Sequence, residues 1–199
     1  MTGKRSSSSV RKQPSLREDG QFNLGAEVIS QLISVRQPII MVDRILGYAS
    51  SPQRQLTAER HISANEPVFV GHFPDLKLWP GVYTIEGLRQ SCLLLDALTE
   101  LERSGVLHDL LTLQGRATLS PRVDEASCQR ALSTLRDSPP LERLPLVLRI
   151  KLLAPVFAGC VMRYRVIQDS TDVRSWSVEA VVDGKRVAKG EVQCQPECG

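Results

Sequence analysis

Apolar residues recur at steps of three and four between Val82 and Leu101, directly after a Pro80-Gly81 pair. This spacing puts the apolar side chains on one face of a helix, so it predicts a long helix that begins at this pair. The predicted buried stripe consists of Val82, Ile85, Leu88, Cys92, Leu95 and Leu98. A single acidic residue, Glu86, lies in the first two turns of this helix.

Glu86 lies about one helical turn from Val82 and from Gln90, at the border of the apolar stripe. Low-dielectric surroundings raise the pKa of a carboxyl group, and a carboxyl group with a raised pKa can act as an acid. The amides of Gly81 and Val82 precede the first complete turn, where N–H groups have no acceptor within the helix. These amides are therefore candidate donors to a carbonyl oxygen that becomes an oxyanion.

His72 lies in a turn between Gly71 and Pro74, just ahead of the predicted helix. A bent backbone can present an imidazole to a cavity, where it can act as a base. Residue types alone favour a plainer interpretation, in which His72 is a hydrogen-bonded surface residue and Glu86 is solvated or salt-bridged.

The whole segment from Gly71 to Gln90, GHFPDLKLWPGVYTIEGLRQ, resembles the 3-hydroxyacyl-[acyl-carrier-protein] dehydratases of fatty-acid synthesis. In that family a Gly-His-Phe-Pro turn precedes a Pro-Gly-Val step, an acidic residue fourteen positions after the His, and a Gln four positions further on. The matching residues here are His72, Pro80, Gly81, Val82, Glu86 and Gln90.

The resemblance implies an α+β hotdog fold, in which an antiparallel sheet wraps around a long central helix. It extends to residues 36–45, which resemble the family's first strand, and to the polar strand that begins at Gln55. Residues 146–195 resemble the later antiparallel strands, with Asp183-Gly184 as the turn of a hairpin.

The family's substrate is a (3R)-3-hydroxyacyl chain, held as a thioester on the phosphopantetheine arm of an acyl carrier protein. Its product is the trans-2-enoyl thioester, and no cofactor is needed. By the resemblance, His72 removes a C2 proton and the Gly81 amide holds the thioester carbonyl. Glu86 assists departure of the 3-hydroxyl, directly or through a held water, and Gln90 orients Glu86.

The resemblance also implies a homodimer, in which two sheets join edge to edge and each active site takes its His and its Glu from different subunits. A monomer would then be inactive. The aromatic residues near the predicted site either line an acyl tunnel or belong only to the core; they are Phe69, Phe73, Trp79 and Tyr83.

Arg89 departs from the family pattern, which commonly has a small residue before the Gln. A cation three residues after Glu86 on a helix either pairs with it and lowers its pKa, faces solvent, or meets a polar acyl group. Asp75, Lys77 and Val35 also depart from the pattern. These changes favour a specialised dehydratase, for example one that acts on a polyketide or another modified acyl chain.

The chain has 199 residues, of which 42% are hydrophobic, and no apolar run approaches the length of a membrane helix. We expect one domain over residues 21–195 and no membrane span. Residues 1–20 hold five basic and two acidic residues and are rich in Ser, so they read as a disordered tail. No nucleic-acid motif accompanies these charges.

The five cysteines lack the short paired spacings of a zinc site, apart from Cys194 and Cys198 near the end of the chain. We expect reduced thiols, a cytoplasmic location and no metal. His61 and His108 are interpreted as structural or solvated.

Residues 107–145 form an insertion where the family has a much shorter connection. Within it, residues 112–120 could form an added strand, and residues 121–138 suggest a short helix that ends before Pro139-Pro140. A loop of this length usually has a role, so a lid, a wall of the acyl tunnel and a partner surface are the alternatives.

Three functions follow from these observations. The first is dehydration, supported by the pairing of His72 with Glu86. The second is another hotdog reaction on an acyl thioester, such as double-bond isomerisation or thioester hydrolysis. The third is a non-catalytic subunit that binds an acyl carrier protein, for which the basic tail is the positive sign.

Overall fold

The computed structural model describes residues 23–108, 110–111, 126–137 and 146–195. The predicted basic tail and the predicted strand at 112–120 lie outside these residues. The elements, in chain order, are α1 (Ala26–Leu32), β1 (Arg44–Ala49), β2 (Gln55–Ile62), the 3-10 helix η1 (Pro67–Val70), α2 (Gly81–Arg103), α4 (Ala126–Asp137), β3 (Leu146–Leu152), β4 (Cys160–Gln168), β5 (Ser175–Val182) and β6 (Lys185–Cys194).

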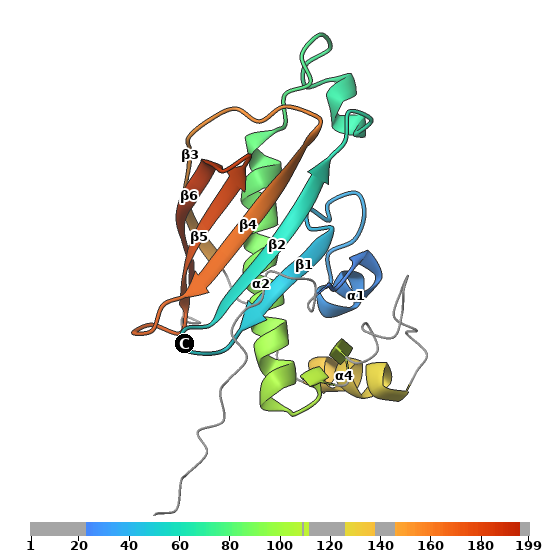
Figure 1. Cartoon of the computed structure of the whole chain (residues 1–199), viewed down its shortest axis with the longest axis vertical. Coiled ribbons are helices and arrows are strands. Elements are labelled where there is room, and N and C mark those ends of the chain that lie inside the picture. The colour runs from blue at the N-terminus through green and yellow to red at the C-terminus, as the bar shows by residue number, and fades with distance from the viewer. Residues whose placement is uncertain (1–22, 109, 112–125, 138–145, 196–199) are drawn as a thin grey trace, which may run out of the picture.

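The strands form an antiparallel sheet in the order β1-β2-β4-β5-β6-β3, and the long helix α2 packs across one face of it (Figure 1). Side chains alternate between the two faces of a strand. In β4, for example, Met162, Tyr164 and Val166 are fully buried, whereas Arg163 and Arg165 are exposed. The arrangement confirms the predicted hotdog fold.

The core lies between α2 and the inner face of the sheet. Leu88, Leu94, Leu95, Leu98 and Leu101 of α2 are fully buried there. The predicted stripe is wrong at Val82, which is 63% exposed. The buried residues in the first turns are instead the polar Thr84 and Gly87, which the apolar pattern could not reveal.

The β5–β6 hairpin turns at Asp183-Gly184, as predicted. Both residues have positive φ angles, 48° and 75°, and Val182 pairs with Lys185 across the turn. A two-residue hairpin of this kind requires positive φ at both central positions, which explains the Asp-Gly sequence.

The predicted first strand at 36–45 is wrong over most of its length, because β1 begins only at Arg44. Residues 36–43 form a loop that is hydrogen-bonded to α2. The amide of Met41 donates to the side-chain oxygen of Gln90 at 2.8 Å, so at this position a helix side chain satisfies the backbone. The amide of Asp43 donates to the carbonyl of Glu59 in β2 at 2.9 Å, next to the start of β1.

The predicted short helix in the insertion corresponds to α4, which contacts α1 and α2. In Figure 1, α4 lies beside the C-terminal end of α2, opposite the end at which α2 begins.

Candidate active site

The turn that carries His72 is fixed by its own backbone hydrogen bonds. The His72 amide donates to the carbonyl oxygen of Val68 at 3.0 Å, which ties the turn to η1. Phe73 and Leu76 exchange two backbone hydrogen bonds, so the loop closes on itself directly after the His. The imidazole is therefore held in place by a short, self-bonded loop, as the Gly-His-Phe-Pro sequence predicted.

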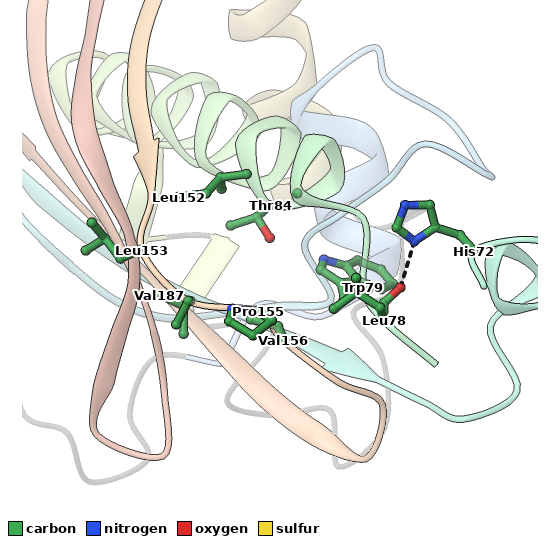
Figure 2. A pocket seen from close by; sticks show the side chains of 11 residues that line it. His72, Leu78, Trp79, Thr84, Leu152, Leu153, Pro155, Val156 and Val187 are labelled. Atoms are coloured by element: carbon green, nitrogen blue, oxygen red, sulfur yellow. Dashed lines mark hydrogen bonds between the residues drawn. The ribbon is translucent and has the colours of Figure 1, made fainter. Parts of the chain in front are cut away.

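The imidazole of His72 makes one hydrogen bond that sets its protonation pattern. Its Nδ1 atom lies 3.0 Å from the carbonyl oxygen of Leu78 (Figure 2). Because a carbonyl oxygen can only accept, Nδ1 must carry the hydrogen. In the neutral ring, Nε2 then has a free lone pair, which is the state of a general base.

A cavity of about 380 Å³ lies beside His72, between the start of α2 and the segment that follows β3. His72, Trp79, Gly81 and Thr84 line one side of it (Figure 2). The opposite wall is apolar and consists of residues 152–156 and Val187.

Gly81 allows the cavity wall to approach the helix. A Cβ atom at this position would collide with the end of the Leu152 side chain. Gly81 also follows Pro80, the N-cap of α2, so its amide lies in the first turn, where the helix itself offers no acceptor. The cavity is thus bordered by the His72 imidazole and by the first residue of α2.

Glu86 lies on another side of α2 and is not part of the cavity lining. Its carboxylate accepts hydrogen bonds from Arg89 Nε and Nη2 at 2.8 and 2.7 Å, and from Gln90 Nε2 at 2.8 Å. Of the alternatives for Arg89, the structure shows pairing with Glu86. Gln90, which is fully buried, also donates to the carbonyl oxygen of Ile39 at 2.7 Å and accepts from the Met41 amide.

The remaining predicted site residues divide between core and surface. Trp79 is buried and its ring meets that of Tyr83 edge-on, with centroids 5.3 Å apart. Phe73 stacks on the His72 ring with centroids 4.5 Å apart, but it is half exposed. Five predicted site residues do not line the cavity of their own chain: Phe73, Val82, Tyr83, Arg89 and Gln90.

A family description matches this part of the chain. Residues 33–127 match the FabA-like domain, which includes the whole segment from His72 to Gln90. The chain is 44% identical over 82 residues to a 3-hydroxyacyl-[acyl-carrier-protein] dehydratase FabZ of Neisseria meningitidis serogroup C, covering 41% of this chain and 54% of the relative. It is 27% identical over 174 residues to the enzyme of that name from Pseudoalteromonas translucida, covering 86% of this chain and 93% of the relative.

The chain carries a FabA-like domain over residues 33–127 and is similar to 3-hydroxyacyl-[acyl-carrier-protein] dehydratases. It spans about half the length of the Neisseria relatives that it matches. Among solved structures, the dehydratase heterocomplex ApeI:P from Xenorhabdus doucetiae is similar in fold, with a TM-score of 0.50 and 14% identity over 85% of this chain and 91% of that chain.

The sequence pointed to the residues before and on α2 but missed the opposite wall of the cavity. Leu152 ends β3, residues 153–156 follow it and Val187 lies in β6, all about seventy or more positions after Gly81 in the chain. Thr84 was also missed, because a lone Thr in an amphipathic helix carries no motif. The described part of the insertion, α4, does not line this cavity.

Within the described part of the chain, no group of three His, Cys, Asp or Glu residues could hold a metal ion. Among the same residues, no helix is both long enough and apolar enough to cross a membrane.

Proposed function

We propose that the protein dehydrates (3R)-3-hydroxyacyl thioesters of an acyl carrier protein to trans-2-enoyl thioesters. The observation that carries this proposal is the hydrogen bond from His72 Nδ1 to the Leu78 carbonyl, which leaves Nε2 as a base at the edge of an apolar cavity. No cofactor enters the reaction, because a proton and a hydroxide leave the substrate and form water.

In the proposed reaction, His72 Nε2 takes a proton from C2. The electron pair of the broken C–H bond forms the C2–C3 double bond as the C3–O bond breaks. Negative charge that develops on the thioester oxygen is stabilised by the Gly81 amide. The departing hydroxide gains a proton on the side of Glu86 from a water that the carboxylate holds, and leaves as water. The proton that His72 took from C2 then returns to the held water, which restores both the water and the neutral imidazole.

We propose that the working unit is a homodimer in which Glu86 of one subunit faces the cavity of the other. Two observations support it. Glu86 does not line the cavity that contains His72 of its own chain. At the β1 edge, Leu24 exchanges two backbone hydrogen bonds with Ile45, whereas β3 pairs only with β6 within the described residues, so its other edge is open for a second chain.

The exposed apolar side chains also favour this partner. Phe73, Val82, Leu152, Leu153 and Phe157 are each more than 45% exposed, and they come from the His72 loop, the start of α2 and the segment that follows β3. Large exposed apolar groups gathered near one site mark an interaction surface. We propose that the other partner is the acyl carrier protein itself, and that the protein acts in the cytoplasm, where free thiols such as Cys92 and Cys160 remain reduced.

The deciding experiment uses mass spectrometry of an acyl carrier protein loaded with a 3-hydroxyacyl chain. We expect the wild type to remove one water from the chain, and His72→Ala and Glu86→Gln each to abolish this loss. A carrier that comes back deacylated would indicate a thioesterase, and an unchanged carrier that still binds the protein would indicate a non-catalytic binding subunit. A product with a shifted double bond would indicate an isomerase.

Mixing the two inactive variants tests the shared site. If His72 and Glu86 of one site come from different subunits, a mixed dimer of the His72→Ala and Glu86→Gln variants has one site with both changes and one intact site. Random mixing should then restore about a quarter of the wild-type activity, because half of the dimers are mixed. No recovery from dimers that have exchanged subunits would contradict the shared site.

A further inference from the structure

The cavity beside His72 is mostly apolar, but two of its lining residues carry polar groups with no protein partner. The indole N–H of Trp79 is buried and has no hydrogen-bond partner. The second group is the hydroxyl of Thr84, which makes no hydrogen bond to another described residue. Both side chains are only 3% exposed. In a buried site, a polar group without a partner costs free energy, so each such group calls for an explanation.

The Trp79 ring cannot easily turn to find another acceptor. The guanidinium of Arg60 lies 5.8 Å from its centroid, and the rings of Phe69 and Tyr83 lie 6.2 and 5.3 Å away. Its backbone amide is bonded to the Val156 carbonyl at 2.8 Å, which joins the Trp to the opposite cavity wall. The indole N–H is therefore held in a fixed position within the cavity lining.

Thr84 differs from the buried Ser91 and the partly buried Thr99 of the same helix. Ser91 and Thr99 donate back to the carbonyl oxygens of Gly87 and Leu95, four residues earlier, at 2.7 and 2.8 Å. Among the described residues, Thr84 has no such bond. Figure 2 shows its hydroxyl turned toward the space enclosed by Trp79, Pro155 and Val187.

A buried indole without a partner is not enough by itself to indicate a ligand. Trp176, which is 2% exposed, also lacks a hydrogen-bond partner for its N–H, and it does not line the cavity. Trp79 is different because it shares one cavity with the Thr84 hydroxyl and with His72. Donor and hydroxyl are thus positioned together beside the proposed reaction centre.

We infer that Trp79 and Thr84 form a polar subsite for a neutral oxygen, a ketone or a hydroxyl, carried by the acyl chain beyond C3. This inference rests on the proposed function and names its substrate class. An indole N–H can only donate, so it needs an acceptor such as a keto or hydroxyl oxygen. The Thr84 hydroxyl can donate to the same oxygen or accept from a hydroxyl. The cavity lining has no Asp or Glu, so it offers nothing to a cationic group.

An all-methylene chain would fill the same space but leave both polar groups buried and unpaired. Sites built to hydrogen-bond a substrate oxygen discriminate strongly against analogues that lack it. The remaining walls, which consist of Leu152, Leu153, Pro155, Val156 and Val187, suit the hydrocarbon parts of the same chain. The subsite thus selects an oxygenated acyl chain over a plain fatty acyl chain.

The test measures binding, so that it does not depend on the dehydration step. The probes are acylpantetheine amides without a 3-hydroxyl, which cannot react: a plain C10 chain and C10 chains with one ketone at C5, C7 or C9. Calorimetry gives the affinity of full-length wild type, Thr84→Val and Trp79→Phe for each probe. Trp176→Phe is the matched control, because it removes a buried, unpartnered indole outside the cavity.

We expect at least one ketone probe to bind the wild type about tenfold more tightly than the plain chain. Thr84→Val and Trp79→Phe should each reduce this ratio severalfold, and Trp176→Phe should leave it unchanged. Equal affinities for all four chains, no binding of any chain, or a ratio that survives both cavity variants would overturn the subsite. The carrier-protein dehydration assay on the wild type is run separately. Selective binding without dehydration would refute the proposed function and support the subsite. Dehydration without selective binding would support the proposed function and refute the subsite.

Discussion

Arg89 holds the carboxylate of Glu86 through two parallel hydrogen bonds, from Nε and Nη2, one helical turn away on α2. Such a bidentate pair fixes the orientation of a carboxylate as well as its charge. Gln90 adds a third hydrogen bond to one of the same oxygens and links it to the 36–43 loop. Glu86 is therefore a positioned carboxylate, which suits a group that holds a water or a leaving hydroxyl in one place.

Loss of this clamp should reduce the proposed reaction more than it reduces binding. In Arg89→Met the carboxylate keeps only its bond from Gln90, so its orientation is no longer fixed. We expect kcat to fall by about tenfold with KM little changed, because misplacement of a catalytic group acts on the chemical step. Steady-state kinetics with a loaded carrier protein measure this. Arg89→Lys keeps the charge but cannot make two parallel hydrogen bonds, so its kcat should lie between those of the wild type and Arg89→Met. An unchanged kcat in Arg89→Met would contradict this role of Arg89.

Replacement of Gln90 should destabilise the fold. In Gln90→Leu, the amide of Met41 and the carbonyl of Ile39 lose their partner. A buried unpaired group costs about 1–3 kcal/mol, so we expect a loss of about 2–4 kcal/mol for the pair, measured by urea unfolding. Gln53→Leu, at an exposed position, is the control and should change stability by less than about 0.5 kcal/mol. Equal midpoints for the two variants would contradict this role of Gln90.

Two glycines of α2 should respond differently to alanine. At Gly87 the added Cβ would collide with the ring of Tyr164, which is fully buried and cannot move aside. At Gly81 it would meet only the end of the flexible Leu152 side chain. We expect Gly87→Ala to cost about 1–3 kcal/mol by overpacking, and Gly81→Ala to cost clearly less. Thermal unfolding compares the two, and a larger loss at Gly81 would reverse this assignment.

Two carboxyl groups should give stability changes of opposite sign. Burial and the nearby Glu100 raise the pKa of Asp96 above its ordinary value. Its contribution to stability is then present below the unfolded-state pKa and is lost as pH rises through the folded-state pKa. Asp96→Asn should therefore raise the urea midpoint at pH 7 and leave it unchanged near pH 3.

Asp169 provides the comparison. Hydrogen bonds from the hydroxyl and amide of Thr171 lower the pKa of Asp169, so its contribution is present above the unfolded-state pKa and is lost as pH falls through the folded-state pKa. Asp169→Asn should lower the midpoint at pH 7, with the difference vanishing in acid. If both variants raised the urea midpoint at pH 7, hydrogen bonding would not be the cause at Asp169. If both variants lowered it, burial would not be the cause at Asp96.

Elements whose signals are local could be predicted from the order of the residues alone. The helix that begins at Gly81 follows from apolar spacing, and the Asp183-Gly184 hairpin follows from the need for two positive φ angles. The contiguous motif from His72 to Gln90 also revealed the resemblance to the dehydratases, because its residues lie within twenty positions of one another.

The residues that line the site depend on how distant elements pack against one another. The cavity wall opposite α2 comes from residues 152–156 and Val187, which reach Trp79 and Thr84 through the pairing of β3 with β6. Residues 36–45 were predicted as a strand because they resemble the family's first strand, yet the Met41 amide and the Ile39 carbonyl are bonded to the side chain of Gln90. Hydrogen-bond partners that lie about fifty residues apart leave no periodic signal in a sequence, since they depend on how the elements pack and not on local spacing.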